Sequence, residues 1–202
     1  MRHLGTHLRD ESGATLVEYA IVMALFLFLL FGLIDFGRLA NSVAMAEKAV
    51  HIAARTAIVR PPACAGVPLR HERGSATAPG YGTPCRSVPG ACAMPAAVIC
   101  TGSAGNATAV EIFNRVRPLL PAGSTIADLR FRYEPDPALG FLGGPYTPIV
   151  TVELADIDFV FTTPLGALAG VAGVPGSTLG GTVVLPTASV SLPAEDLAHG
   201  GS

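Results

Sequence analysis

The sequence predicts an α+β protein, in which a long amino-terminal membrane-to-periplasm α-helix packs on a small antiparallel β-sheet head with a short second helix. Residues 14–59 contain no proline and follow a helical apolar pattern. Most of the chain's 23 glycines and 17 prolines follow residue 60, which suits a strand-and-loop domain. The segments at 125–133, 146–161 and 182–192 are strand-like in composition.

Composition limits the classes of function. The 202 residues leave room for one membrane segment and one modest globular domain. Half of the residues are hydrophobic, 14% are charged, and the formal net charge is −2. No basic patch is present, so a nucleic-acid partner has no support.

We expect three regions along the chain. Residues 1–13 form a polar leader whose charges nearly cancel. Residues 14–60 form the long helix, of which 14–34 cross the membrane and 35–60 are amphipathic. The stretch from Ala20 to Ile34 is continuously apolar, and 14–34 would span roughly 30 Å, the thickness of a bilayer core. Residues 61–202 form the head.

The second half of the helix carries an apolar seam at alternating spacings of three and four residues, which is typical of a helix packed on one side. Pro61 and Pro62 end the helix. The seam consists of Phe36, Leu39, Val43, Ala46, Val50, Ala53 and Ala57.

Four cysteines lie in a glycine- and proline-rich stretch at 61–106, which we interpret as a disulfide-stapled loop region. They are Cys64, Cys85, Cys92 and Cys100, separated by 20, 6 and 7 residues. This spacing does not match the close ligand pairs of zinc sites, so we expect two disulfides and no metal. The three pairings remain open. Disulfides would place the head in an oxidising compartment, the periplasm or the cell exterior.

Asn106 is predicted to cap a second helix that ends near Arg117. The strand-like segment at 146–161 represents either two strands or one strand with a bulge near Ala155 and Asp156. A flexible glycine-rich loop is expected at 165–181. Three or four antiparallel strands would complete the head.

Glu18 is the most informative residue, because a carboxylate at the start of a membrane helix is costly without a positive partner. One interpretation is a stray acid solvated by lipid headgroups. The other, which we favour, is a charge that awaits a partner in an assembly. If a protease cuts after Gly13, the new amino group of Ala14 on a neighbouring subunit is such a partner, and the pair would set the axial register.

Other acidic residues have less specific interpretations. Asp35 follows the membrane stretch and is three residues from Arg38, so the two side chains can pair; the position is typical of a boundary marker at the headgroups. Glu153, Asp156 and Asp158 form an acidic cluster, but their spacing fits no EF-type calcium loop. No nucleophile, phosphate-loop or dinucleotide motif is present, so the sequence predicts neither an enzyme nor a cofactor.

A conventional signal peptide is a further alternative. Ala44-Met45-Ala46 has the small-x-small pattern of a cleavage site. It lies ten residues beyond Ile34, with charged residues between, and the apolar seam continues through it. Cleavage there is therefore not expected.

The pattern Gly13-Ala14-Thr15-Leu16-Val17-Glu18-Tyr19 resembles the processing site of type IV prepilins. Together with the Leu- and Phe-rich stretch and the membrane-exit motif Asp35-Phe36-Gly37-Arg38, it is similar to TadE-like pseudopilins. These are minor pilins of the tight adherence (Tad/Flp) pilus system. The detailed similarity covers about residues 11–60.

The resemblance implies a non-enzymatic minor pilin involved in Tad pilus assembly, surface adhesion and biofilm formation. It implies cleavage between Gly13 and Ala14 by a prepilin peptidase, and contact of Glu18 with the Ala14 amine of a neighbour; Tyr19 matches the Glu-Tyr pair of Flp-type pilins. Its partners would be other Tad pilins and pseudopilins, the inner-membrane assembly platform and the lipid bilayer. The expected location is the bacterial inner membrane, with a single pass and a periplasmic head.

A different class of protein shares the anchor. A single-pass, membrane-tethered periplasmic binding or scaffold protein would have the same helix but would not enter a filament. Such a protein has no need of a cut after Gly13.

Overall fold

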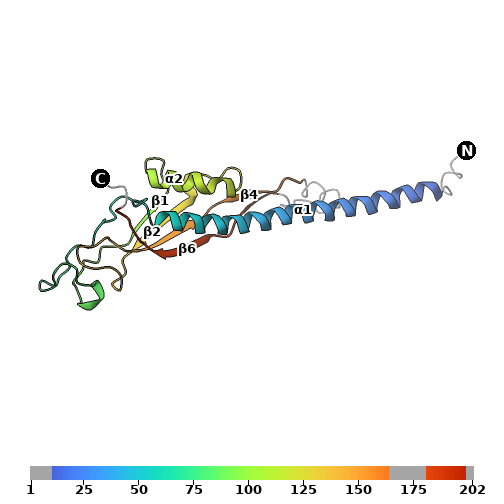
Figure 1. Cartoon of the computed structure of the whole chain (residues 1–202). Coiled ribbons are helices and arrows are strands. Elements are labelled where there is room, and N and C mark those ends of the chain that lie inside the picture. The colour runs from blue at the N-terminus through green and yellow to red at the C-terminus, as the bar shows by residue number, and fades with distance from the viewer. Residues whose placement is uncertain (1–10, 164–180, 199–202) are drawn as a thin grey trace, which may run out of the picture. The chain divides into compact units, whose positions relative to one another are not determined.

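The computed structural model describes residues 11–163 and 181–198 (Figure 1). The chain divides into two compact units, one of Met1–Ala40 with Val160–Val183 and one of Asn41–Phe159 with Val184–Ser202. The predicted α+β class is confirmed. The loop predicted at 165–181 lies, apart from Gly181, outside the described residues.

The helices are α1 (Glu11–Ala57) and α2 (Ala107–Val116), and the strands are β1 (Val98–Thr101), β2 (Leu129–Glu134), β3 (Ile149–Leu154), β4 (Asp158–Val160), β5 (Thr182–Val184) and β6 (Ala188–Pro193).

Helix α1 ends at Ala57, three residues before the end of the predicted helix at residue 60. Pro61 and Pro62 cannot continue a helix, and the residue before a proline avoids helical geometry. The carbonyl of Ile58 accepts the backbone N–H groups of Glu195 and Asp196 at 3.0 and 3.1 Å. A carboxyl-terminal segment of the chain therefore satisfies a carbonyl that the helix leaves without an internal partner.

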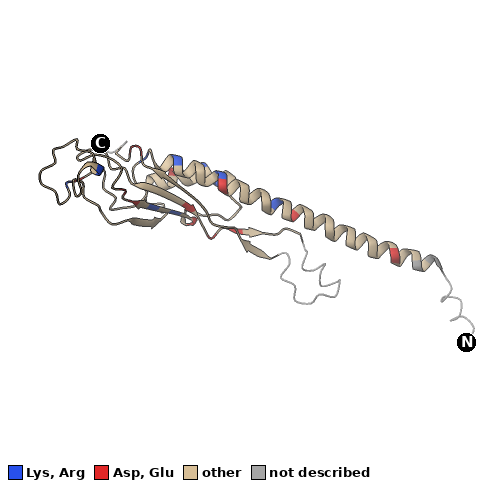
Figure 2. Cartoon of the chain, turned by 90° about the horizontal axis from the view of Figure 1, so that it is seen from below, with Lys and Arg blue, Asp and Glu red and all other residues tan. Residues whose placement is uncertain are grey.

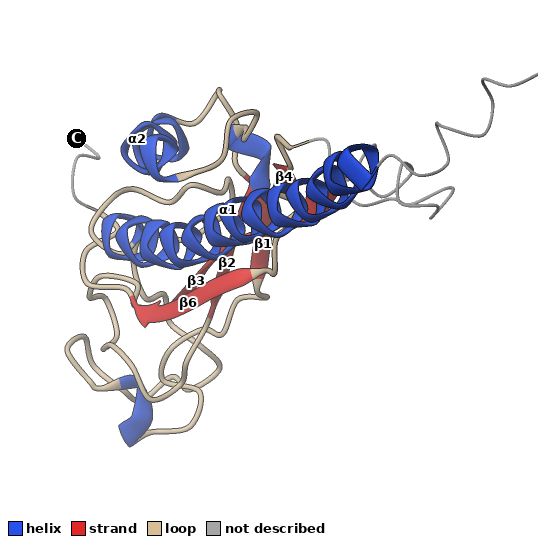
Figure 3. Ribbon diagram, turned by 90° about the vertical axis from the view of Figure 1, so that its right-hand side faces the viewer, coloured by secondary structure: helices blue, strands red, loops and turns tan. Residues whose placement is uncertain are grey.

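The main sheet has the order β1-β2-β3-β6, and its three strand pairs are all antiparallel. Along β2, side chains alternate strictly between buried and exposed, with Leu129, Phe131 and Tyr133 on the buried face. The carboxyl-terminal half of α1 lies along one face of this sheet (Figure 3). The sheet therefore has one face in the core and one in solvent, as antiparallel sheets commonly do.

Small side chains line the part of α1 that lies in the core. Ala46, Ala49, Ala53, Ala54 and Ala57 are all buried, which lets the helix backbone approach the sheet closely. The predicted seam is confirmed over Ala46, Val50, Ala53 and Ala57. It does not extend to Phe36, which is 59% exposed and makes an edge-to-face contact with Phe161, with the ring centroids 6.0 Å apart.

Three predictions for the head, one for a loop and two for strands, need correction. The stretch 61–106 is not all loop, because β1 lies within it and pairs with β2; four residues are too few to show a clear alternation. The segment 125–133 begins as a 3₁₀ turn at Ile126–Asp128, where Thr125 and Asp128 form a capping box. The predicted strand at 182–192 is two strands, because Pro186 has no N–H group to donate.

The predictions for the second helix and for 146–161 are confirmed. The Asn106 side chain accepts the N–H of Ala109 at 2.9 Å, and α2 ends just before Pro118. Strands β3 and β4 are separated at Asp156, whose φ of 59° lies in the left-handed region. The main chain therefore turns at the position where the sequence predicted an interruption.

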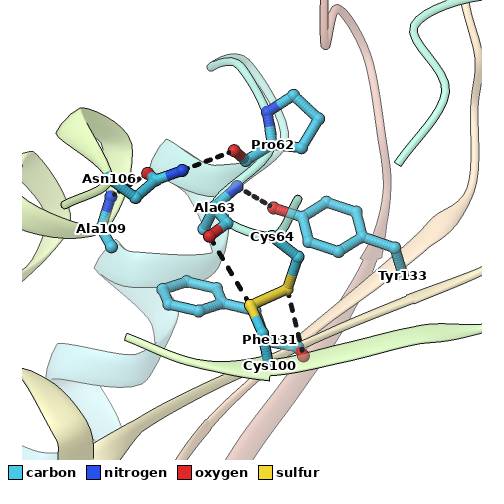
Figure 4. The surroundings of a disulfide bond; sticks show 8 residues. All are labelled: Pro62, Ala63, Cys64, Cys100, Asn106, Ala109, Phe131 and Tyr133. Carbon is cyan, nitrogen blue, oxygen red and sulfur yellow. Dashed lines mark hydrogen bonds between the residues drawn. A yellow bond between two sulfur atoms is a disulfide. The ribbon is translucent and has the colours of Figure 1, made fainter. Parts of the chain in front are cut away.

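Two disulfides are present, Cys64–Cys100 and Cys85–Cys92, which resolves the open pairing. The first joins the turn after α1 to strand β1 (Figure 4). Around it, the Tyr133 hydroxyl accepts the N–H of Ala63 at 2.9 Å, and the Asn106 amide donates to the Pro62 carbonyl at 3.1 Å. The end of α1, the start of α2 and strands β1 and β2 are therefore tied together at one point.

Alkaline pH should destabilise this junction through Tyr133. Burial raises the pKa of its hydroxyl to about 12 from an ordinary 10. Above pH 10 the unfolded chain releases a proton that the folded chain retains, so stability falls as the pH rises from 10 to 12, by about 2–3 kcal/mol in total. Urea unfolding between pH 8 and 12 measures this loss. Tyr133→Phe should be less stable at pH 8 and should lose this part of the alkaline dependence; an unchanged pH profile in the variant would contradict the assignment.

Candidate functional site

The amino-terminal part of α1 presents apolar side chains to its surroundings. An 18-residue window within Thr15–Ala57 has a mean hydropathy of 2.5, and none of it is buried in the chain. In the sequence no charged residue stands between Glu18 and Asp35, and Figure 2 shows a long uncharged stretch there. This helix could span a membrane, by its length and composition. The large exposed side chains include Leu16, Val17, Ile21, Val22, Leu25, Phe26, Leu29, Leu30 and Leu33.

The residues predicted for processing and assembly lie in the first turns of this helix. Gly13, Glu18 and Tyr19 are exposed, and Ala14 lies in the same helix. A Cβ atom added at Gly13 would meet nothing within 4 Å. Glycine in a helix costs about 1 kcal/mol relative to alanine. Since the chain leaves room for a side chain at position 13, packing within the chain does not explain why a glycine is there.

Gly32 and Gly37 show the same feature further along α1. A Cβ atom at either position would also meet nothing within 4 Å. Both residues lie inside the helix, where glycine is unfavourable. Their lack of a side chain would permit another helix to approach closely, as small residues do between membrane helices.

Asp35 is the most unusual residue of α1. Its carboxylate is fully buried, although its neighbours Ile34 and Phe36 are exposed. It accepts hydrogen bonds from the Thr163 N–H at 3.1 Å, from the Thr162 hydroxyl at 3.2 Å and from the Thr163 hydroxyl. Arg38, one turn along the helix, donates to it at 3.1 Å and also donates to Thr162.

These contacts join α1 to the segment that follows β4. All of the groups concerned belong to the unit formed by Met1–Ala40 and Val160–Val183. A buried carboxylate is tolerated only when donors satisfy its oxygens, and here two threonines and an arginine do so. Asp35 therefore holds Thr162 and Thr163 against the helix at the end of the apolar stretch.

The predicted pairing of Asp35 with Arg38 is confirmed. The position of Asp35 at a headgroup boundary stays a prediction; the structure adds that the carboxylate is enclosed by the chain itself. Sequence spacing could not show this, since Thr162 and Thr163 lie 127 and 128 residues away. No motif connects the two segments.

Asp35→Ala should release the threonine segment from α1. The Thr163 amide would lose a hydrogen bond to a charged acceptor, and its hydrogen exchange should become at least about tenfold faster. Exchange measured by mass spectrometry on the full chain in detergent micelles tests this. Lys48→Gln, at an exposed position further along the same helix, is the control: isolated surface charges contribute little, and exchange at Thr163 should change by less than about threefold. Equal effects of the two substitutions would contradict the assigned role of Asp35.

The acidic cluster of the head does not converge on a cation site. Asp156 forms an ion pair with Arg130, and Glu153 lies opposite Arg130 in the register of β2 and β3. In the described part of the chain, the side chains that come together with metal-ligand geometry are instead His71, Cys85 and Cys92, whose ligand atoms all lie within 4.8 Å of one another. Both of these cysteines are oxidised to a disulfide.

Comparison with known protein families identifies the same part of the chain, helix α1. The family model described as TadE-like protein matches residues 13–55, which begin at Gly13 and include Glu18 and Asp35. No curated protein and no solved structure gives a significant match to the chain. The match at 13–55 confirms the resemblance predicted from the sequence, and it places this helix with the TadE-like proteins and associates the chain with Tad pilus systems.

Proposed function

We propose that the protein is a non-enzymatic minor pilin or pseudopilin that takes part in the assembly of Tad pili, and through them in surface adhesion and biofilm formation. The observation that carries this proposal is the first part of α1: an exposed apolar helix with a carboxylate, Glu18, five positions after a glycine that its own chain does not require. The match to the TadE-like family over the same residues supports it.

Assembly would proceed through neutralisation of Glu18. Cleavage between Gly13 and Ala14 creates an α-amino group, positively charged at neutral pH, at the start of the apolar helix. In a bundle of such helices, the amine of one subunit pairs with Glu18 of a neighbour. An acid in an apolar bundle is costly unless paired, so one axial register is favoured over those that leave the charges apart.

Gly32 and Gly37 support helix packing in the same assembly. Each glycine lowers the intrinsic stability of the helix, and no side chain of the same chain occupies the space beside it. Bare glycine surfaces let two membrane helices approach closely enough for extensive van der Waals contact. The inner surface of a helical filament is where such contacts would form.

The partners and location follow from this role. We infer a single pass through the bacterial inner membrane, with residues 61–202 in the periplasm, where the two disulfides are stable. Partners are a prepilin peptidase, other Tad pilins and pseudopilins, the inner-membrane assembly platform and the lipid bilayer. The leader, residues 1–13, remains on the cytoplasmic side.

Mass spectrometry of the mature amino terminus tests the proposal. The full chain is expressed in a host with a Tad prepilin peptidase, and a chain beginning at Ala14 is the expected product. Gly13→Leu should prevent the cut, because a large side chain would replace the small residue directly before the cleaved bond. Gly5→Leu, a matched change elsewhere in the leader, should leave it intact.

The alternative outcomes are distinct. A chain that still begins near Met1 with the active peptidase present would contradict the pilin role and indicate a membrane-tethered periplasmic protein. A chain beginning at Glu47, after Ala44-Met45-Ala46, would indicate signal-peptide cleavage and a secreted protein. Removal of the peptidase should abolish the Ala14 terminus, which identifies the enzyme responsible.

A further inference from the structure

The two-stranded ribbon of β4 and β5 exposes apolar side chains. Val160 of β4 is 56% exposed, and Val183 of β5 is 42% exposed. Beyond these two residues, the Phe161 N–H donates to the Gly181 carbonyl at 3.4 Å. A ribbon of only two strands is marginally stable in water, and exposed valines add to that cost. We therefore expect another surface to cover these side chains.

The chain that leaves β4 is fastened to α1. The Asp35 carboxylate accepts the Thr163 N–H at 3.1 Å and the Thr162 hydroxyl at 3.2 Å. Next to this contact, the rings of Phe36 and Phe161 meet edge to face. Asp35 is the first charged residue after the apolar stretch of α1. The end of the ribbon is therefore held where the apolar stretch of the helix ends.

The surroundings of the ribbon are apolar in sequence and on the surface. No Asp, Glu, Lys, Arg or His stands between Asp158 and Glu195. On α1, the helical spacing places Leu29, Leu33 and Phe36 on one face, and all three side chains are exposed. The apolar surface of the candidate membrane helix therefore continues through Phe36 to the ribbon. A continuous apolar surface without charges is typical of contact with lipid.

We propose that Phe36, Val160, Phe161 and Val183, which we call the ribbon patch, contact the bilayer that α1 crosses, at the boundary between lipid headgroups and acyl chains. The protein then holds the membrane at two places, through the apolar stretch of α1 and through the ribbon patch. This inference rests on the proposed membrane span of α1. It does not depend on cleavage after Gly13 or on entry of the chain into a filament.

The backbone of the ribbon limits its depth in the membrane. In the described part of the chain, β4 and β5 form a sheet of only two strands, so each strand has an edge outside the ladder. Backbone N–H and C=O groups on an open edge have no partners in hydrocarbon, which excludes the ribbon from the bilayer core. The boundary layer supplies water for these groups and acyl chains for the valine and phenylalanine side chains.

A second contact with the membrane would orient α1. An apolar helix held by its own length alone can turn about its axis, and residues at the interface limit that rotation and the tilt. Thr162 and Thr163 are bonded to Asp35, on one side of α1. Contact of the ribbon patch with lipid would therefore direct one face of the helix toward the ribbon and present the remaining faces to neighbouring helices.

Fluorescence quenching by brominated lipids tests the proposal, because the chain contains no tryptophan of its own. The full chain is placed in phosphatidylcholine liposomes whose acyl chains carry bromine either close to the headgroup or near the chain end. Val183→Trp puts the fluorophore on the ribbon patch, at an exposed position with room for the ring. Leu29→Trp reports on the membrane helix. Tyr81→Trp is the matched control on an exposed ring of the head, beside the charged Arg73.

We expect bromine close to the headgroup to lower the Val183→Trp emission by at least about twofold, and bromine near the chain end to lower it less, because the ribbon patch lies at the boundary layer. The Leu29→Trp emission should fall in both kinds of lipid, since this residue lies within the apolar stretch. The Tyr81→Trp emission should change by less than about a tenth, because its position is polar and outside the acyl chains.

The outcomes separate this inference from the proposed membrane span. If Leu29→Trp is not quenched, α1 does not lie in the bilayer, and both proposals fail. If Leu29→Trp is quenched but Val183→Trp responds as little as Tyr81→Trp, the span stands and the ribbon patch is not in lipid. A blue-shifted Val183→Trp emission without quenching would mean that protein, such as a second copy of the chain, covers the patch, which also overturns the inference. Val160→Trp, on the other strand, repeats the measurement if Val183→Trp does not fold.

Discussion

Glu18→Gln is expected to reduce incorporation of the protein into pili by at least about a hundredfold while leaving it in the membrane. The substitution keeps the size and hydrogen-bonding capacity of the side chain but removes its charge. A neighbour's α-amine would then enter the helical bundle without a counter-ion, and breaking such a buried pair costs about 3–5 kcal/mol. Sheared pili and membrane fractions, probed with antibodies against the head, measure the two quantities.

The control is Glu47→Gln, on the same helix but beyond the apolar stretch. Glu47 is exposed on the face of α1 that does not contact the sheet. Loss of the Glu47 charge should change incorporation of the protein into pili by less than about twofold, since isolated surface charges contribute little. If Glu18→Gln enters pili as well as the unmodified chain does, Glu18 does not set the register. If the variant is also absent from the membrane, insertion rather than assembly has failed.

Replacement of Cys64 and Cys100 by serine should destabilise the head by about 4 kcal/mol. A disulfide limits the unfolded chain more when it closes a longer loop, and this one joins residues 36 apart. It also holds the turn after α1 against β1, at the junction where Tyr133 and Asn106 make their hydrogen bonds. Chemical unfolding of the full chain in detergent, followed by circular dichroism, measures the change.

Replacement of Cys85 and Cys92 by serine is the matched control. These residues are only 7 apart, so the same relation gives about 2 kcal/mol, roughly half as much. The order of the two losses is the specific prediction. A larger loss for the Cys85 and Cys92 pair would mean that the short loop, rather than the junction at Cys64, limits the stability of the head.

The helices were predictable because their signals are local. Proline stops α1, Asn106 caps α2, and an apolar run between Glu18 and Asp35 shows a possible membrane span; each of these depends on residues within a few positions. The residues proposed for processing and assembly, Gly13 and Glu18, could be identified for the same reason. A lone carboxylate and a bare glycine in an apolar helix are unusual wherever that helix lies.

The strands were predicted less well, because pairing partners lie far apart in sequence. Strand β1 has only four residues and is recognisable mainly by its register with β2, which lies about thirty residues later. The division at Pro186 shows the converse case, in which a single residue without an N–H group interrupts an otherwise suitable segment.

The sequence by itself determined the class of the fold, the long helix with its carboxylate, and the position of the four cysteines in one glycine- and proline-rich stretch. Only the tertiary structure decided which cysteines pair, that Thr162 and Thr163 enclose Asp35, and that His71 lies beside Cys85 and Cys92. The physical reason is the range of the interactions. Helix propensity and capping depend on residues close together in the sequence, whereas a buried carboxylate or an unpaired N–H is satisfied by whichever distant group the fold brings within hydrogen-bonding distance.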